Sequence, residues 1–244
     1  MKTHEINFIL IKPAKARNHK EFDLSNGIIK PVRFVSMKDN HMVAAQPQEQ
    51  HPPQMTIEAY FAFEEASETR HEYVNGRVYA MTGASWNHTV ITGNTQAHLH
   101  AQLRGKPCTS IPNEMKLKVD SKSVSFRYPD LMVVCGDPQF FENRKDTISN
   151  PTVIIEVLSP STALKDRNEK LEEYIKIDSL QEYVLISQHE AKVERFKRDA
   201  SDEWLYKPVK GLENSLELPS IACVMELSAL YEEIEFDKQD SDRQ

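Results

Sequence analysis

Three continuous apolar runs constrain the fold more than any other feature of the sequence. They are DLMVVC at 130–135, TVIIEVL at 152–158 and EYVLIS at 182–187. Apolar runs without polar alternation are typical of central strands that are covered on both faces. A helix is expected at roughly 162–177, between the second run and the third. Strand, helix and strand in this order predict an α/β fold with a βαβ-like unit.

Shorter signals predict the remaining elements. Thr56 is an N-cap candidate for a short amphipathic helix. The pair Asn75-Gly76 lies between two β-prone runs and predicts a type I′ hairpin. A helix is expected over 87–104 and a strand over 114–119. The segments KVERFKRD, EWLYKPV and LELPS are expected to form an antiparallel extension near the C-terminus.

Composition divides the chain into three parts. Residues 1–54 carry eight Lys and Arg against five Asp and Glu, and they end in the polar stretch QPQEQHPPQ. We expect them to form a weakly ordered extension and linker, and they are also compatible with an over-extended start site. Residues 55–235 are predicted to form the folded domain. Residues 236–244 are predicted to be a charged, fraying tail.

The composition also limits the class of protein. No stretch approaches the ~20 apolar residues that cross a bilayer, and the first residues lack a signal-peptide pattern. We therefore expect a cytoplasmic protein without a membrane partner. The formal net charge of -7 argues against non-specific coating of nucleic acid, which depends on phosphate neutralisation. Cys108, Cys135 and Cys223 are far apart in the sequence, so we expect small buried hydrophobes and no disulfide.

One carboxylate interrupts a strand that otherwise reads as buried. Glu156 lies inside TVIIEVL, and Asp130 begins the preceding apolar run after Pro129. A buried carboxylate without a partner is very costly, so a cation is expected to meet it. Two carboxylates on neighbouring core strands can converge, and a hard divalent cation such as Mg²⁺ would bind them.

The helix after Glu156 supplies a complementary charge. Lys170 shares a helix face with Asp166 and with Tyr174, because each pair is four residues apart. Lys170 is therefore placed to reach the carboxylate pair, where it would orient a water or stabilise developing charge. Glu72 in the hairpin and His88 at the start of the second helix are further candidates.

Each of these residues also has a structural interpretation. Asp130 alone could be a strand-entry residue, and Glu156 could form a purely structural ion pair. Lys170 alone would more often be a solvated helix lysine. His88 could be a helix-start surface residue, and Tyr174 a core residue. For Asp166 we favour a first-turn acid that the helix dipole stabilises.

Taken in order, the motifs resemble those of a known family. They are HEYVNGRVYAM, NHTVI, YPDLMVV, PTVIIEVLSPST and DRNEKLEEY. This pattern is similar to that of the Uma-two family, described as putative restriction endonucleases, within the PD-(D/E)XK nuclease superfamily. The resemblance covers about residues 55–235. It implies a restriction-endonuclease-like core in which a central mixed β-sheet is flanked by helices.

The resemblance also implies roles for individual residues. Asp130, Glu156 and the backbone carbonyl of Val157 would hold the metal. Lys170 would be the catalytic lysine, and Glu72 an additional acidic residue of the site. The superfamily pattern has a lysine two residues after the second acid, where this chain has Leu158. Catalysis therefore depends on whether Lys170 reaches Glu156 from the helix.

These observations lead to one expected function and two alternatives. The expected protein is an endonuclease that hydrolyses DNA phosphodiester bonds with Mg²⁺, or with Mn²⁺ in its place. Backbone contacts are expected from four residues on the way to Asp130, namely Lys116, Lys118, Lys122 and Arg127. A two-fold homodimer would suit an enzyme that cuts both strands. The alternatives are a nucleic-acid-binding module that keeps the fold without cleavage, and a hydrolase of a smaller phosphoester.

Overall fold

The computed structural model describes residues 9–11, 54–120, 124–159 and 163–236. The expectations for 1–54 and 236–244 fall almost entirely outside these ranges and stay predictions. Within the first range, Ile9–Ile11 forms a short strand, β1, that pairs antiparallel with β12 (Trp204–Lys210). None of the helices in the described ranges is long and apolar enough to cross a membrane.

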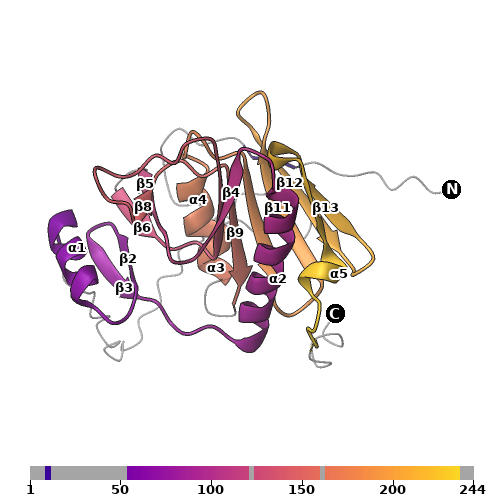
Figure 1. The fold of residues 1–244 in the computed structure, drawn as a ribbon, viewed down its shortest axis with the longest axis horizontal. Coiled ribbons are helices and arrows are strands. Elements are labelled where there is room, and N and C mark those ends of the chain that lie inside the picture. The colour runs from indigo at the N-terminus through magenta and orange to yellow at the C-terminus, as the bar shows by residue number, and fades with distance from the viewer. Residues whose placement is uncertain (1–8, 12–53, 121–123, 160–162, 237–244) are drawn as a thin grey trace, which may run out of the picture.

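A seven-stranded mixed sheet forms the centre of the molecule (Figure 1). Its order is β1-β12-β11-β10-β9-β7-β4. Only β9 and β10 pair in parallel within it, so the predicted mixed sheet is confirmed. The remaining strands of the sheet are β4 (Cys108–Pro112), β7 (Leu131–Cys135), β9 (Val153–Leu158), β10 (Glu182–Ser187) and β11 (Lys192–Arg198).

The predicted βαβ-like unit is confirmed, because a helical segment connects the parallel strands β9 and β10. This segment has three parts: α3 (Ala163–Lys165), a π-helical turn η1 (Asp166–Lys170) and α4 (Leu171–Tyr174). π-Helical turns are rare, and they occur frequently at functional sites. The turn begins at Asp166 and ends at Lys170, two of the residues that the sequence places on one helix face.

The two faces of the sheet pack against different layers. Val153 and Ile155 of β9 face a core that includes α2 (Trp86–Leu103), whereas Ile154 and Leu158 face a core that includes Tyr174. This alternation is the period of two expected of a strand. Figure 1 shows α2 on one side of the sheet and the α3–α4 segment on the other. Glu156 therefore points toward the helical segment rather than toward α2.

A second, smaller sheet lies beside α3 and α4 (Figure 1). Its order is β3-β2-β6-β5-β8. The predicted hairpin is confirmed, since Asn75 and Gly76 both have positive φ, 53° and 81°, as a type I′ turn requires. The strands are β2 (His71–Val74), β3 (Arg77–Ala80), β5 (Lys116–Asp120), β6 (Val124–Arg127) and β8 (Thr147–Ile148). Helix α1 (Ile57–Ala66) packs Tyr60 and Phe61 against this sheet.

The C-terminal extension is antiparallel, as predicted. β11 continues the main sheet into β12, and β13 (Ser215–Leu218) pairs with β14 (Cys223–Glu226). A 3₁₀ turn η2 (Pro219–Ile221) lies between these two strands, and α5 (Leu227–Leu230) follows. The pair β13-β14 and α5 join the same core as α2.

The expectation for the cysteines is wrong for one pair. Cys108 of β4 and Cys135 of β7 form a disulfide. The antiparallel register of these strands sets the two residues opposite one another, although 27 positions separate them in the chain. Sequence spacing does not reveal such a cross-strand contact. Cys223 is a buried free cysteine, as expected.

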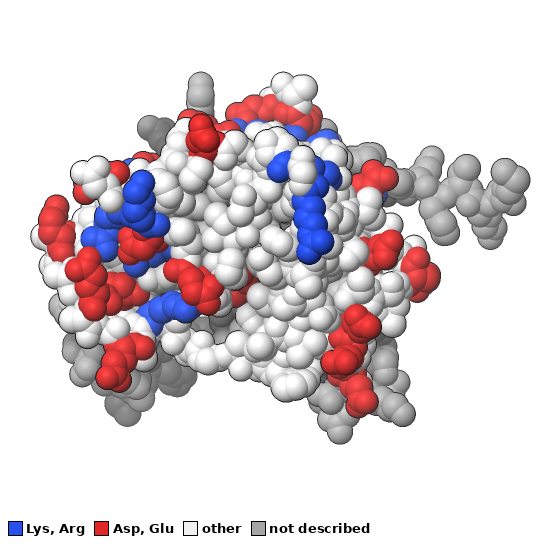
Figure 2. Space-filling model, viewed as in Figure 1, with Lys and Arg blue, Asp and Glu red and all other residues white. Residues whose placement is uncertain are grey.

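The surface carries mixed charge on the face shown in Figure 2. Basic and acidic side chains lie intermixed over the side formed by α1 and the small sheet. The middle of this face is largely uncharged over most of α2, with basic side chains over its upper end, and the α2 sequence contains no Lys, Arg, Asp or Glu. On this face the charges do not gather into one broad basic patch, so contacts to a polyanion would have to be local.

Candidate active site

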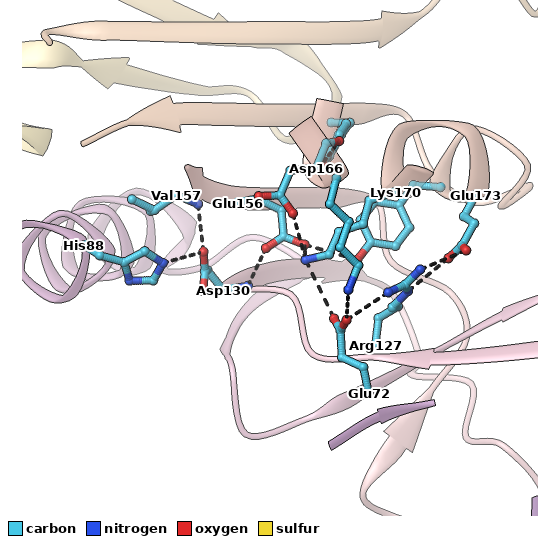
Figure 3. A network of polar contacts seen from close by, with 12 residues as sticks. Glu72, His88, Arg127, Asp130, Glu156, Val157, Asp166, Lys170 and Glu173 are labelled. Atoms are coloured by element: carbon cyan, nitrogen blue, oxygen red, sulfur yellow. Dashed lines mark hydrogen bonds and ion pairs between the residues drawn. The ribbon is translucent and has the colours of Figure 1, made fainter. Parts of the chain in front are cut away.

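The register of two neighbouring strands brings the predicted carboxylates together. β7 and β9 are antiparallel with Leu131 opposite Ile155, so Asp130 lies beside Glu156. The Asp130 backbone N–H donates to Glu156 Oε2 at 3.4 Å. The Val157 backbone N–H donates to Asp130 Oδ2 at 2.7 Å. Figure 3 shows both carboxylates at the meeting point of these strands, and both are buried.

Glu156 meets a cation there, and the cation comes from the helical segment. Lys170 Nζ donates to Glu156 Oε1 at 2.8 Å, and the Tyr174 hydroxyl donates to the same oxygen at 3.1 Å. Glu156, Lys170 and Tyr174 are all buried. The sequence condition for catalysis, that Lys170 reach Glu156 from the helix, is therefore met in the geometry.

Lys170 joins three carboxylates from three different elements (Figure 3). Besides Glu156, its Nζ lies 3.1 Å from Asp166 Oδ1 and 3.7 Å from Glu72 Oε1. Asp166 lies in the first turn of η1, as expected, and it is only 2% exposed, so it is also a buried member of the cluster. The π-helical turn holds Asp166 and Lys170 on the same side, toward the sheet. Lys170 is consequently a central member of the cluster and not a solvated helix lysine.

Glu72 extends from β2 into the cluster, where cations surround it. Arg127 Nη1 donates to its Oε2 at 2.8 Å, and Lys165 Nζ donates to the same oxygen at 2.9 Å. Burial raises the pKa of Glu72, but Lys170, Arg127 and Lys165 outweigh it and lower the pKa to about 2. Glu72 is thus ionised at neutral pH, and its oxygens are already paired with Arg127, Lys165 and Lys170. This arrangement suits positioning these side chains better than binding a metal.

Arg127 connects the small sheet to α4. Its side chain is fully buried, and its Nε and Nη2 donate to both oxygens of Glu173, at 3.0 and 2.9 Å. A fork of this kind matches the geometry of a carboxylate. The expectation that Arg127 contacts a DNA backbone is therefore wrong, because long-range pairing buries it.

The other predicted backbone contacts have similar outcomes. Lys116 is buried and paired with Asp146 at 2.7 Å, so its expected role is wrong for the same reason. Lys118 pairs with Asp120 at 2.6 Å on β5. Lys122 lies outside the described residues. The strand that leads to Asp130 consequently offers few open cations for a polyanion.

His88 belongs to the site through Asp130. Ser85 caps α2 by accepting a hydrogen bond from the His88 backbone N–H, and this fixes the first turn of the helix. The ring Nε2 then lies 3.1 Å from Asp130 Oδ2. Burial lowers the pKa of His88, but the hydrogen bond and charge of Asp130 outweigh it, so the net pKa is raised. Asp130 therefore stabilises the protonated form of the His88 ring.

The electrostatics of the cluster favour an added positive charge. Burial raises the pKa of Glu156, with the nearby carboxylates of Asp130 and Asp166 adding to it and Lys170 opposing it. The cluster holds five carboxylates and three Lys or Arg side chains: Glu72, Asp130, Glu156, Asp166, Glu173, Arg127, Lys165 and Lys170. When His88 is protonated beside Asp130 the excess of two carboxylates falls to one, and a cation bound beside Glu156 would favour the ionised form of this carboxyl, whose pKa burial raises.

The donor set fits a metal that takes few protein ligands. Among the described residues, no three His, Cys, Asp or Glu side chains are grouped to hold a metal by themselves. Asp130 and Glu156 nevertheless provide two adjacent hard oxygen donors. Mg²⁺ commonly binds one or two carboxylates and fills its remaining positions with water or substrate phosphate. The residues present therefore fit Mg²⁺ better than a metal that needs a closed cage of side chains.

Comparison with known proteins places the chain in a family. The model of Uma2, described as "Putative restriction endonuclease", matches residues 57–229. Uncharacterized protein slr1290 of Synechocystis sp. (strain ATCC 27184 / PCC 6803 / Kazusa) is 31% identical over 186 residues, covering 75% of this chain and 95% of that protein. Uncharacterized protein sll1609 of the same strain is 33% identical over 157 residues, covering 64% and 88%.

One solved structure has a similar fold. It is described as a putative nuclease belonging to DUF820, from Anabaena variabilis ATCC 29413. The TM-score is 0.59 at 16% sequence identity, and the match covers 72% of this chain and 97% of that one. The fold, the order of the motifs and the family match agree, and the chain belongs to the Uma2 family of putative restriction endonucleases.

Proposed function

We propose that the protein is a metal-dependent endonuclease that hydrolyses phosphodiester bonds in DNA. The observation that carries the proposal is the meeting of Asp130 and Glu156 on adjacent core strands, with buried Lys170 bonded to Glu156. Perturbed, buried charges that converge in this way are typical of catalytic sites. The family description, a putative restriction endonuclease, supports the same reaction class.

Asp130 and Glu156 would hold Mg²⁺, or Mn²⁺ in its place, and the Val157 carbonyl would be a further ligand. When bound, the metal would polarise the scissile phosphate and lower the pKa of a bound water. The His88 ring would keep Asp130 oriented toward that position through the contact at 3.1 Å. The Tyr174 hydroxyl would similarly fix the Glu156 carboxylate.

Lys170 would place its ammonium beside the reacting phosphate. Asp166 and Glu72 hold the Nζ atom from two sides, so its position is restricted before substrate binds. A preorganised cation stabilises developing negative charge without reorganising at the moment of reaction. We therefore assign Lys170 to charge stabilisation and water orientation.

Replacing Lys170 with methionine tests this assignment. We expect kcat to fall on the order of 10²–10³-fold, the scale for losing one preorganised electrostatic contact. Mg²⁺ binding should weaken but remain measurable, because Asp130 and Glu156 remain while Glu156 loses the Lys170 charge that opposes its raised pKa. Cleavage of plasmid DNA and calorimetric titration with Mg²⁺ measure the two effects separately. Lys170→Arg is the matched variant, because it keeps the positive charge and so separates the effect of charge from an effect on folding.

Two outcomes would contradict the role of Lys170. A folded Lys170→Met protein that cleaves at the wild-type rate would remove Lys170 from catalysis. A folded variant that loses Mg²⁺ binding together with cleavage would make Lys170 a support of the metal ligands instead. Circular dichroism establishes folding in each case.

A further inference from the structure

One lysine at the edge of the cluster differs from the buried cations. The side chain of Lys165 is 32% exposed, whereas that of Lys170 is 8% exposed and that of Arg127 is fully buried. Lys165 Nζ also lies 5.6 Å from the centre of the Tyr79 ring. Of the three cations that surround Glu72, Lys165 is thus the one with substantial access to solvent.

The ion pair of Lys165 is not needed to neutralise Glu72. Arg127 Nη1 lies 2.8 Å from the Glu72 carboxylate, and Lys170 Nζ lies 3.7 Å from it. Removing a partner from a buried carboxylate is destabilising chiefly when the carboxylate is left uncompensated. Because Arg127 and Lys170 still lie beside Glu72, the carboxylate keeps two buried partners when Lys165 moves to another anion.

Lys165 lies close in the chain to two residues of the candidate site, Asp166 and Lys170. It directly precedes the π-helical turn that begins at Asp166 and ends at Lys170. Its aromatic neighbour Tyr79 lies opposite Glu72 in the β2–β3 pair, so the two side chains share one face of the hairpin. Tyr79 is 39% exposed as a residue, so this lysine and tyrosine lie at the solvent side of the cluster.

We propose that Lys165 is a substrate-binding residue that contacts a backbone phosphate next to the scissile one. The inference rests on the proposed nuclease function and adds a residue that the motif pattern does not include. The ammonium exchanges its bond to Glu72 for the phosphate, which is the interaction expected of a flexible point charge. Tyr79 is a positioning residue that keeps the ammonium at the edge of the site through its ring face.

The test is the salt dependence of DNA binding. Anisotropy of a labelled duplex is measured with EDTA, and again with Mg²⁺ over times too short for cleavage. One lost phosphate contact lowers the slope of log K against log salt by about 0.9 for duplex DNA. If the two proteins bind equally at 1 M salt, this difference in slope makes the binding constant of Lys165→Gln about eightfold lower than that of the wild type at 0.1 M salt. Lys165→Arg should retain the wild-type slope.

Lys210→Gln is the matched control. Lys210 also pairs with a glutamate, Glu190 at 3.1 Å, and its side chain is 59% exposed, but it lies on β12 away from the cluster. Its slope should equal that of the wild type. Tyr79→Leu should weaken binding less than Lys165→Gln and leave the slope near the wild-type value, because it removes no charge.

The outcomes separate this inference from the proposed function. If the wild type binds and cuts DNA while folded Lys165→Gln has the wild-type affinity and slope, Lys165 is not a phosphate contact and the nuclease stands. If Lys210→Gln lowers the slope as much as Lys165→Gln, the effect is general charge and the inference is overturned. If the wild type neither binds nor cuts any nucleic acid, the proposed function fails and this inference fails with it.

Discussion

Replacing Glu156 with glutamine is expected to abolish DNA cleavage, with kcat falling on the order of 10³-fold or more. The glutamine keeps the shape of the side chain, and its oxygen can still accept from Lys170 and Tyr174. What it loses is the charge that the proposed metal needs beside Asp130. The folded state should survive, because burial already disfavours a charge at this position.

Metal binding gives a second measurement on the same variant. A ligand at 100 times its Kd stabilises a folded protein by about 2.7 kcal/mol. Mg²⁺ should therefore raise the thermal unfolding temperature of the wild type and leave that of Glu156→Gln nearly unchanged. Equal stabilisation of both proteins by Mg²⁺ would place the metal elsewhere.

Glu182→Gln is the matched control for this experiment. Glu182 is also a fully buried glutamate in a core strand, β10, and burial raises its pKa as well. Its carboxylate accepts from Ser220, outside the cluster. Cleavage and Mg²⁺ stabilisation should persist in Glu182→Gln. Loss of cleavage in both variants would indicate a general effect of removing a buried carboxylate.

Replacing Arg127 with methionine is expected to cause the largest loss of stability. Arg127 is fully buried, and it forms ion pairs with Glu72 and with Glu173. Removing it leaves Glu173 without its buried partner and weakens the compensation of Glu72, and breaking a buried pair typically costs about 3–5 kcal/mol. Urea denaturation followed by circular dichroism measures the free energy of unfolding.

Arg144→Met is the corresponding control at the surface. Arg144 also pairs with two carboxylates, Glu65 and Asp146, but those side chains are 63% and 42% exposed. Exposed pairs of this kind contribute about 0–1 kcal/mol each. A smaller loss for Arg127→Met than for Arg144→Met would show that the buried network is not what holds the small sheet to α4.

The central part of the site could be predicted from the sequence because its signals are local. The period of two in β9 places Glu156 on the face of Ile154 and Leu158, and helical spacing places Lys170 on the face of Tyr174. An apolar run interrupted by one carboxylate is visible without any knowledge of the fold. The meeting of Glu156 with Lys170 follows from these two local patterns and one βαβ-like unit.

The surrounding residues could not be predicted because they depend on distant partners. From the sequence alone, Arg127 is expected to be an exposed cation. Its burial depends on pairing with Glu72 and Glu173, which lie 55 and 46 positions away. The position of Lys165 in the cluster likewise depends on its ion pair with Glu72, 93 positions away. Asp166 is different, since its spacing of four from Lys170 was visible. The sequence does not indicate how deeply the π-helical turn buries the Asp166 side chain.

Asp130 and Glu156 are proposed to form the metal site of a nuclease. The most direct measurement is conversion of supercoiled plasmid by the wild-type protein across a Mg²⁺ titration, with EDTA and folded Glu156→Gln as controls. We predict nicked and linear products that rise with Mg²⁺ and vanish in both controls. A folded wild type that binds DNA but never cuts it, with Mg²⁺ or Mn²⁺ and on single-stranded or duplex DNA, would contradict the claim and favour a binding module.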